Sequence, residues 1–136
     1  MADIYVGVDP GTVHLGLATL NEEAKWALAL KVAGVDDAIL AFLCYLEQQL
    51  QEGDRVVVAC EDYAFMGPRK NYGAMNQLIG GIRGLCVAFN LIFYLVQPRE
   101  KERAGKQLTR PKGQEDHAWD ARCIAWLGRE KHNARP

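Results

Sequence analysis

Short apolar runs separated by turn residues make up the first quarter of the chain. Ile4 to Val8 is an apolar run that ends at Asp-Pro-Gly, and an extended pattern resumes from Leu15 to Leu20. From Trp26 to Val32, apolar residues recur at every second position, which is the period of a strand with one better covered face. These segments predict three antiparallel strands, the first two of them joined as a hairpin.

Helical periodicity begins after the third strand. Apolar residues from Ile39 to Leu50 recur at steps of three and four, with Asp36 as the candidate cap. Val56 to Cys60 is a continuous run of the kind found in strands that are covered on both faces. The later segments predict a helix over about 71–89, a strand over Leu91 to Val96, a basic connection, and a helix over about 114–129. Glycines grouped in the first of these helices indicate that another backbone approaches closely, from the sheet or from a partner; they are Gly80, Gly81 and Gly84.

The order of these elements predicts an α/β fold. We expect a five-stranded mixed sheet in which the first three strands are antiparallel and the later strands are parallel, with helices on both faces. A chain of 136 residues has the size of one compact domain, so we expect residues 1–136 to form a single unit.

Composition excludes several classes of protein but names no partner. With 49% hydrophobic residues, 24% charged residues and a net charge of −1, the chain is typical of a globular protein without a bias toward disorder. The four cysteines are widely spaced among apolar residues, which indicates buried free thiols in a reducing compartment. The N-terminus lacks a signal-peptide pattern, and no long apolar run is present, so we expect a cytoplasmic protein that does not enter membranes.

Two acids follow directly after apolar strands. Asp9 ends the first strand and Glu61 ends the fourth, and the carboxyl ends of parallel strands are where α/β sheets usually place their chemistry. Asp9 before Pro-Gly could equally cap a turn. Glu61 follows five small or apolar residues, so a site that needs negative charge explains it better than solvation alone.

The last predicted helix carries a second polar pair. His117 and Asp120 are three residues apart and therefore project from one face of the helix, where they could act as two ligands or form a solvated surface pair. The adjacent Asp116 is an alternative to His117. The three-residue step to Asp120 favours His117.

These motifs together resemble one known family. The run Gly-Val-Asp-Pro-Gly-Thr followed by Gly16, the apolar strand ending at Glu61, and the final segment HAWDARCIA are similar to the RuvC family of Holliday junction resolvases. The resemblance covers nearly the whole chain. It implies an RNase H-like fold, with the metal-binding and catalytic positions at Asp9, Glu61, His117 and Asp120.

The implied activity is metal-dependent cleavage of DNA. In a two-metal site, one ion activates the attacking water and the other stabilises the departing oxygen, while carboxylates hold both ions. Asp9 would bridge the two ions, and Glu61 and Asp120 would each complete the coordination shell of one ion. His117 could bind a metal or position water. Oxygen ligands favour Mg²⁺, with Mn²⁺ as a substitute that tolerates the nitrogen ligand, and without metal the acids should repel one another and raise some of their pKa values.

Two segments are candidates for contact with DNA. The stretch from Arg99 to Lys112 holds six basic residues against two glutamates, and the segment after Glu61 interleaves aromatic with basic side chains. The candidate DNA-binding residues are Tyr63, Phe65, Arg69, Lys70, Lys106, Arg110 and Lys112. A solvated charged loop and an apolar core are the alternatives for the two segments. Family members carry an additional helix and a lysine before the last helix; this chain is shorter there, and Lys112 is the candidate replacement for that lysine.

The resemblance also implies partners. Resolvases of this family act as two-fold dimers on four-way junctions, so we expect a homodimer that binds branched DNA. The compact form resembles phage-encoded relatives and leaves open whether a bacterium or its phage encodes it. Alternatives are a YqgF-like RNA-processing nuclease and a non-catalytic nucleic-acid-binding module of the same fold. A kinase of the actin-like superfamily needs far more chain than this.

Overall fold

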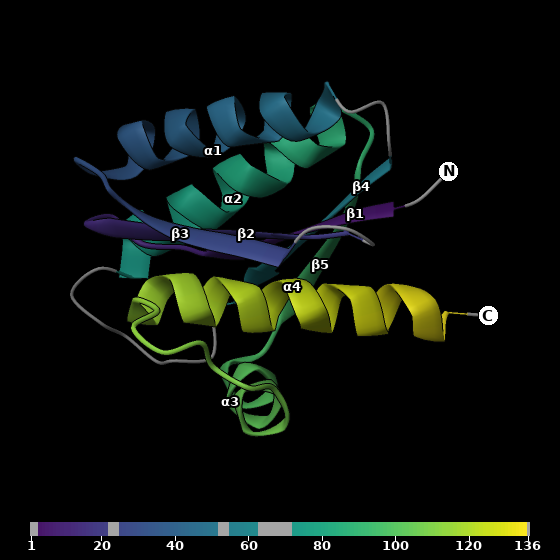
Figure 1. Cartoon of the computed structure of the whole chain (residues 1–136). Coiled ribbons are helices and arrows are strands. Elements are labelled where there is room, and N and C mark those ends of the chain that lie inside the picture. The colour runs from purple at the N-terminus through teal and green to yellow at the C-terminus, as the bar shows by residue number, and fades with distance from the viewer. Residues whose placement is uncertain (1–2, 22–24, 52–54, 63–71, 136) are drawn as a thin grey trace.

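A computed structural model describes residues 3–21, 25–51, 55–62 and 72–135 (Figure 1). Within these residues it contains five strands and four helices. In chain order they are β1 (Asp3–Asp9), β2 (His14–Leu20), β3 (Lys25–Lys31), α1 (Val35–Leu50), β4 (Arg55–Glu61), α2 (Tyr72–Ala88), β5 (Ile92–Val96), α3 (Pro98–Gln107) and α4 (Asp116–Ala134). None of the helices in the described part of the chain is long and apolar enough to cross a membrane.

The strands form one sheet in the order β3-β2-β1-β4-β5. β1 pairs with β2 and β2 pairs with β3 in antiparallel fashion, whereas β4 is parallel to both β1 and β5. The predicted five-stranded mixed sheet, antiparallel first and parallel later, is therefore confirmed. Its central strand is β1, so the residue that ends β1 lies in the middle of the sheet.

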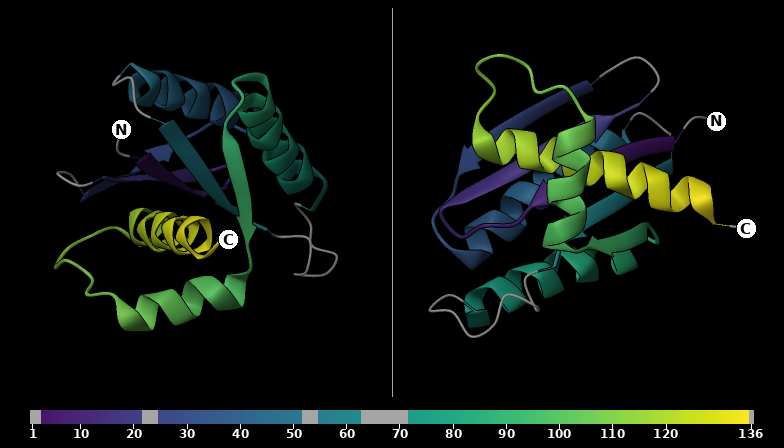
Figure 2. Two further views of the ribbon diagram at one scale, coloured as in Figure 1. Left: turned by 90° about the vertical axis from the view of Figure 1, so that its right-hand side faces the viewer. Right: turned by 90° about the horizontal axis from the view of Figure 1, so that it is seen from below.

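Helices cover both faces of the sheet, as the sequence predicts. α1 and α2 lie on one face and α4 lies on the other, while α3 lies outside α4 and crosses it (Figures 1 and 2). The α3 helix touches α4 through a small apolar cluster formed by Ala104, Trp119 and Cys123. α3 thus adds a fourth layer, outside the three formed by α1 and α2, the sheet, and α4 (Figure 1).

The two faces of the sheet are packed differently. The face toward α1 and α2 buries large aliphatic and aromatic side chains such as Phe42, Leu46 and Leu78, each worth roughly 1.5–3 kcal/mol of burial. Between the sheet and α4 the buried residues include three alanines, Ala18 on β2 and Ala121 and Ala125 on α4. They pack beside Tyr5, Leu20 and Val57. Small residues allow α4 to approach the sheet more closely than a helix with large side chains could.

Glycines make this close approach of α4 possible. A Cβ atom on Gly7 of β1 would lie 2.0 Å from the Ala121 carbonyl oxygen and 2.4 Å from the Ala125 nitrogen. A Cβ atom on Gly16 of β2 would lie 2.2 Å from the His117 carbonyl oxygen. Both contacts involve helix backbone, which cannot turn aside as a flexible side chain can. The backbone of α4 is therefore seated directly on β1 and β2.

A polar cluster fixes the other end of α4. His132, buried in the last turns of the helix, places its Nε2 atom 3.2 Å from an oxygen of Asp3 and its Nδ1 atom 3.4 Å from the Tyr94 hydroxyl. Arg55 donates from Nε to the second oxygen of Asp3 over 2.9 Å. This cluster joins α4 to the beginnings of β1 and β4 and to β5, far from the end where β1 stops.

Several local predictions are wrong. The segment after Val96 was predicted to be a basic connection without a helix, but it contains α3. Gln97 and Glu100 form a capping box at the start of this helix, and Pro98 is its first residue. α1 begins after Gly34, which has a φ of 97°, and Asp36 does not cap it.

The glycines of α2 do not face the sheet closely. A Cβ atom added at Gly81 would meet first the side chain of Ile39 on α1, and within the described residues nothing lies within 4 Å of one added at Gly80 or Gly84. Close approach of a partner at these glycines stays a prediction. Among the cysteines, Cys44 is exposed and the other three are buried as expected, all four being free thiols.

Candidate active site

Asp9 and Glu61 lie side by side at one edge of the sheet. Val8 pairs with Cys60 in parallel register, so the next residue of each strand is at the same level. Their side chains are only 4% and 2% exposed. Two neighbouring carboxyl groups are thus held in a nearly dry environment, which is costly for ionised groups unless positive charges accompany them.

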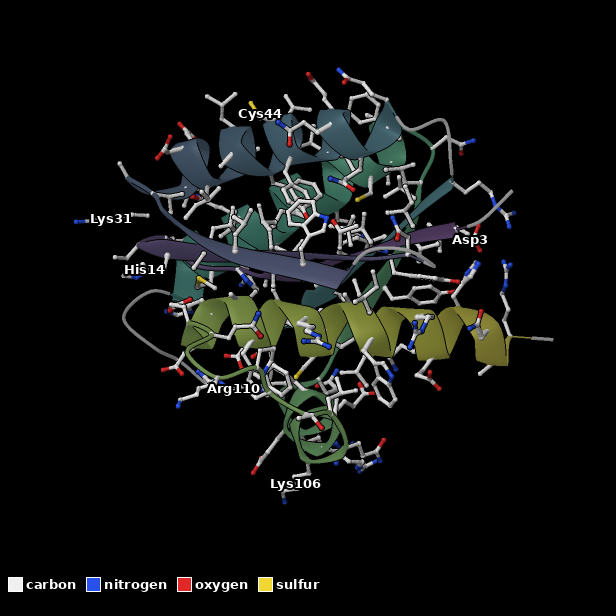
Figure 3. The ribbon with its side chains drawn as sticks, in the orientation of Figure 1. Asp3, His14, Lys31, Cys44, Lys106 and Arg110 are labelled. Carbon is white, nitrogen blue, oxygen red and sulfur yellow. The ribbon has the colours of Figure 1, made fainter. Side chains whose placement is uncertain are left out.

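His117 in the first turn of α4 faces Asp9. Its Nδ1 atom lies 2.9 Å from Asp9 Oδ2, a distance suited to a hydrogen bond that the imidazole donates to the carboxylate. The imidazole of His14 stacks on the outer side of His117, with ring centroids 5.2 Å apart and planes inclined by 12°. Figure 3 shows His14 at the end of the sheet where α4 begins. Because Gly16 touches the His117 carbonyl, the seat of α4 on β2 sets the position of this imidazole.

Lys101 is a site residue that the sequence did not reveal. It projects from α3, and its Nζ atom lies 2.8 Å from Glu61 Oε2 and 3.5 Å from Asp120 Oδ2. Asp120 is the residue three positions after His117 on α4. Lys101 therefore links the acid that ends β4 with the acid on α4. The capping pattern of Gln97 and Glu100, with Pro98 as the first helical residue, was the sequence signal that could have predicted the helix carrying Lys101.

The structure separates the two candidates at the start of α4. Asp116 has an 82% exposed side chain and pairs with Arg110 over 2.5 Å, so it is directed to the surface. His117 is directed to Asp9 instead. Of the two residues, His117 is the one that the fold brings to the buried acids.

The predicted DNA-binding residues fall into two groups. Lys106 lies near the end of α3, and Arg110 and Lys112 lie in the connection to α4; all three are exposed (Figure 3 labels the first two). Arg110 also donates to the Gln114 carbonyl, so it orders this connection. Lys112 is exposed, and among the described lysines Lys101 contacts Glu61 and Asp120. The other four predicted residues, Tyr63, Phe65, Arg69 and Lys70, lie outside the described residues.

Burial and charge shift the pKa values of the site. Burial raises the pKa of Asp9 to about 6; the hydrogen bond from His117 opposes this rise, and the nearby charges of Glu61 and Asp120 add to it. Repulsion between the acids thus contributes to the raised pKa of Asp9, as expected, but burial contributes more. Burial acts to lower the pKa of His117, yet its contact with Asp9 outweighs this effect and the pKa is raised. The pKa of Lys101 is likewise raised, because Glu61, Asp120 and Asp9 outweigh the effect of burial.

The raised pKa of Asp9 predicts that this residue destabilises the metal-free fold at neutral pH. A group with a higher pKa in the folded state binds its proton more tightly there, so stability falls as pH rises from about 4 through about 6. In EDTA, Asp9→Asn should therefore raise the free energy of unfolding at pH 7.5 by about 3 kcal/mol, at ~1.4 kcal/mol per pKa unit over the rise from 3.8 to about 6. At pH 4.5, where the unfolded carboxyl is already mostly ionised, the difference should fall to about a third of that. Urea unfolding at both pH values measures it, and a variant less stable at both would contradict the prediction.

The donor set of the site suits a hard divalent cation. Three carboxylates and one imidazole are the ligands that Mg²⁺ and Mn²⁺ accept, and the ammonium of Lys101 shows that the space between Glu61 and Asp120 accommodates positive charge. In the described part of the chain, no three His, Cys, Asp or Glu side chains already stand close enough together to hold an ion. The residues present therefore fit a metal by their chemistry, with Lys101 standing between two of them.

Sequence comparison finds nothing similar, but structural comparison does. No protein-family model and no curated protein matches this sequence. A solved structure of Thermus thermophilus RuvC in complex with Holliday junction substrate matches with a TM-score of 0.67 and 16% identity, over 90% of this chain and 89% of that chain. The chain has the fold of RuvC.

Two further structures place this likeness in context. Another structure of Thermus thermophilus RuvC matches with a TM-score of 0.66 and 16% identity over 96% of both chains. YeaZ from Pseudomonas aeruginosa matches with a TM-score of 0.50 and 18% identity, over 78% of this chain and 49% of that chain. The RuvC-like, RNase H-like fold that the motifs imply is thus confirmed, and it extends over almost the whole length of both RuvC chains.

Proposed function

We propose that this protein is a metal-dependent endonuclease that cleaves Holliday junctions or related branched DNA. The observation that carries the proposal is the gathering of Asp9, Glu61, His117 and Asp120 at one end of a RuvC-like fold, three of them acids and two of those nearly buried. One of the matching RuvC structures is a complex with Holliday junction substrate, which supports branched DNA as the class of substrate.

The four residues divide the chemistry between them. Asp9, Glu61 and Asp120 would hold Mg²⁺, with two ions as the expected number, and His117 is the nitrogen donor beside them. Bound divalent ions would stabilise the extra negative charge that a phosphodiester gains during hydrolysis. A metal ion binds the ionised form of a carboxyl group, so below the raised pKa of Asp9 the ion must displace a proton and its affinity for the site should fall.

His117 is suited to orient or accept a proton from the attacking water. Its Nδ1 atom contacts Asp9, and the side chain is 42% exposed, so Nε2 is the ring nitrogen that could face a water molecule. The carboxylate fixes the ring and stabilises its protonated form, as the raised pKa of His117 reflects. The stacked imidazole of His14 limits the rotation of this ring.

Phosphate contacts are assigned to the basic residues near the site. Lys106, Arg110 and Lys112 are exposed on the segment that leads into α4, and such contacts give affinity that weakens with salt and carries no base sequence. A homodimer would place two sites on opposing strands of one junction. We therefore propose a dimeric enzyme that makes paired cuts.

The test is a cleavage assay on defined substrates. Labelled four-way junction, linear duplex and structured RNA are incubated with the protein in Mg²⁺, Mn²⁺ or EDTA. Paired nicks in the junction that require a divalent ion are expected. Single nicks at forks or flaps would show general branched-DNA cleavage, and cleavage of RNA alone would show an RNA-processing nuclease. Absence of metal-dependent cutting on every substrate would leave a nucleic-acid-binding module.

A further inference from the structure

The ammonium group of Lys101 lies between two acids of the proposed site, Glu61 and Asp120. Its ammonium contacts Glu61 at 2.8 Å and Asp120 at 3.5 Å, and both of these residues are proposed metal ligands. Only 20% of the side chain is exposed. A surface lysine that neutralises DNA phosphates would be directed outward, as Lys106 on the same helix is. The contacts of Lys101 are made with the site itself.

We propose that Lys101 is the internal counterion of the active site, which holds the acids together without metal and leaves them when the divalent ion binds. The inference rests on the proposed function. An ammonium 2.8 Å from Glu61 and a dication held by the same carboxylate would repel each other strongly in this nearly buried position. Binding of the ion would therefore weaken or break the contact of Lys101 with Glu61.

The architecture allows this exchange without moving the backbone. α3 is held independently of Lys101 by Ala104, which is buried against Trp119 and Cys123, and by a 2.8 Å ion pair between Glu100 and Lys131. The lysine side chain has four rotatable carbon–carbon bonds and an exposed fraction through which it can reach solvent. Only the side chain needs to move for the acids to be released.

The exchange gives Lys101 two opposing effects. Without metal it offsets the repulsion among buried acids, and it competes with the incoming ion for Glu61 and Asp120. Once displaced, it is a free ammonium at the edge of the site, available to a DNA phosphate. Removing its charge should therefore tighten metal binding and at the same time slow cleavage. A residue that merely supported the fold would not tighten metal binding when removed.

The experiment measures Mn²⁺ binding by isothermal titration calorimetry in the absence of DNA. Lys101→Met should lower the dissociation constant for Mn²⁺ about tenfold or more, since a partly buried positive charge is removed from contact with Glu61 and Asp120. The matched control is Lys106→Met, which removes the same charge from an exposed position on the same helix. Its dissociation constant should stay within about twofold of wild type. Lys101→Gln, which can still donate to Glu61 but has no charge, should behave as Lys101→Met and serves if that variant does not fold.

The outcomes separate this inference from the proposed function. If wild type binds Mn²⁺ and the Lys101 variants bind it no tighter, the counterion role is refuted while the metal site stands. If Lys106→Met tightened Mn²⁺ binding as much as the Lys101 variants do, the cause would be the net charge of the protein, and the counterion role of Lys101 would be refuted. If neither wild type nor any variant binds Mn²⁺, the metal-dependent function itself fails, and the inference fails with it.

Discussion

Replacing Asp9 with Asn is expected to lower the rate of junction cleavage by about 10³-fold or more, the scale of losing a group that stabilises transition-state charge. Asp9 is the buried acid at the end of the central strand, in contact with His117 and near both other acids. An amide of the same shape cannot share its charge with a metal ion. Single-turnover cleavage of labelled junction in Mg²⁺ measures the loss.

The chain offers a matched control for this change. Asp116→Asn makes the same chemical change at an exposed residue next to His117, and its rate should stay within about twofold of wild type because surface substitutions rarely matter. Asp9→Asn should also be the more stable protein at neutral pH without metal, so lost activity could not be ascribed to unfolding. Retention of more than a tenth of the wild-type rate by Asp9→Asn would reject the proposed site.

Gly7→Ala is expected to destabilise the protein by about 3 kcal/mol or more, at or beyond the upper end for overpacking. The added Cβ would meet two backbone atoms of α4 at 2.0 and 2.4 Å, so the helix would have to move away from β1. Such a movement would also carry His117 and Asp120 away from Asp9. Urea unfolding gives the stability, and the midpoint should fall without a large change in slope.

Gly80→Ala provides the opposite result in the same experiment. Gly80 lies in α2 with nothing within 4 Å of its added Cβ, so alanine should stabilise the helix by roughly 0.5–1 kcal/mol. Equal effects of the two substitutions would show that glycine flexibility, rather than the seat of α4 on the sheet, determines the stability at Gly7.

The strands were predictable because their side chains follow simple periods. β1 and β4 are buried on both faces, which requires apolar runs, and such runs make Asp9 and Glu61 conspicuous at their ends. His117 and Asp120 were found from the three-residue step on a helix that carries buried apolar residues. The apolar runs placed Asp9 and Glu61 at strand ends, but that His117 and Asp120 would join them was implied only by the family resemblance, since it depends on how α4 packs on the sheet.

The helix α3 and the contacts of Lys101 could not be predicted, because neither depends on a stripe of apolar residues. α3 has a mostly charged sequence and buries only Ala104, so its helical period was invisible and its basic residues resembled a loop. Lys101 was hidden for the same reason, because one lysine among six basic residues carries no sign of its contacts. Whether a lysine meets a phosphate or a buried glutamate depends on where α3 lies against α4, which is a tertiary property.

The seating of α4 on small residues has a consequence for how this scaffold can be altered. The close contacts of α4 with β1 and β2 hold His117 and Asp120 against the sheet. Of the exposed residues 109–113 that precede the helix, Arg110 contacts its start, through Asp116 and the Gln114 carbonyl. We therefore expect the other residues of that connection to tolerate changes in charge while the spacing of the acids stays the same. If the proposed function holds, substrate preference and catalytic chemistry can be varied separately, and variants of residues 109 and 111–113 are the place to test whether preference for forks, flaps or four-way junctions changes while the acids stay in place.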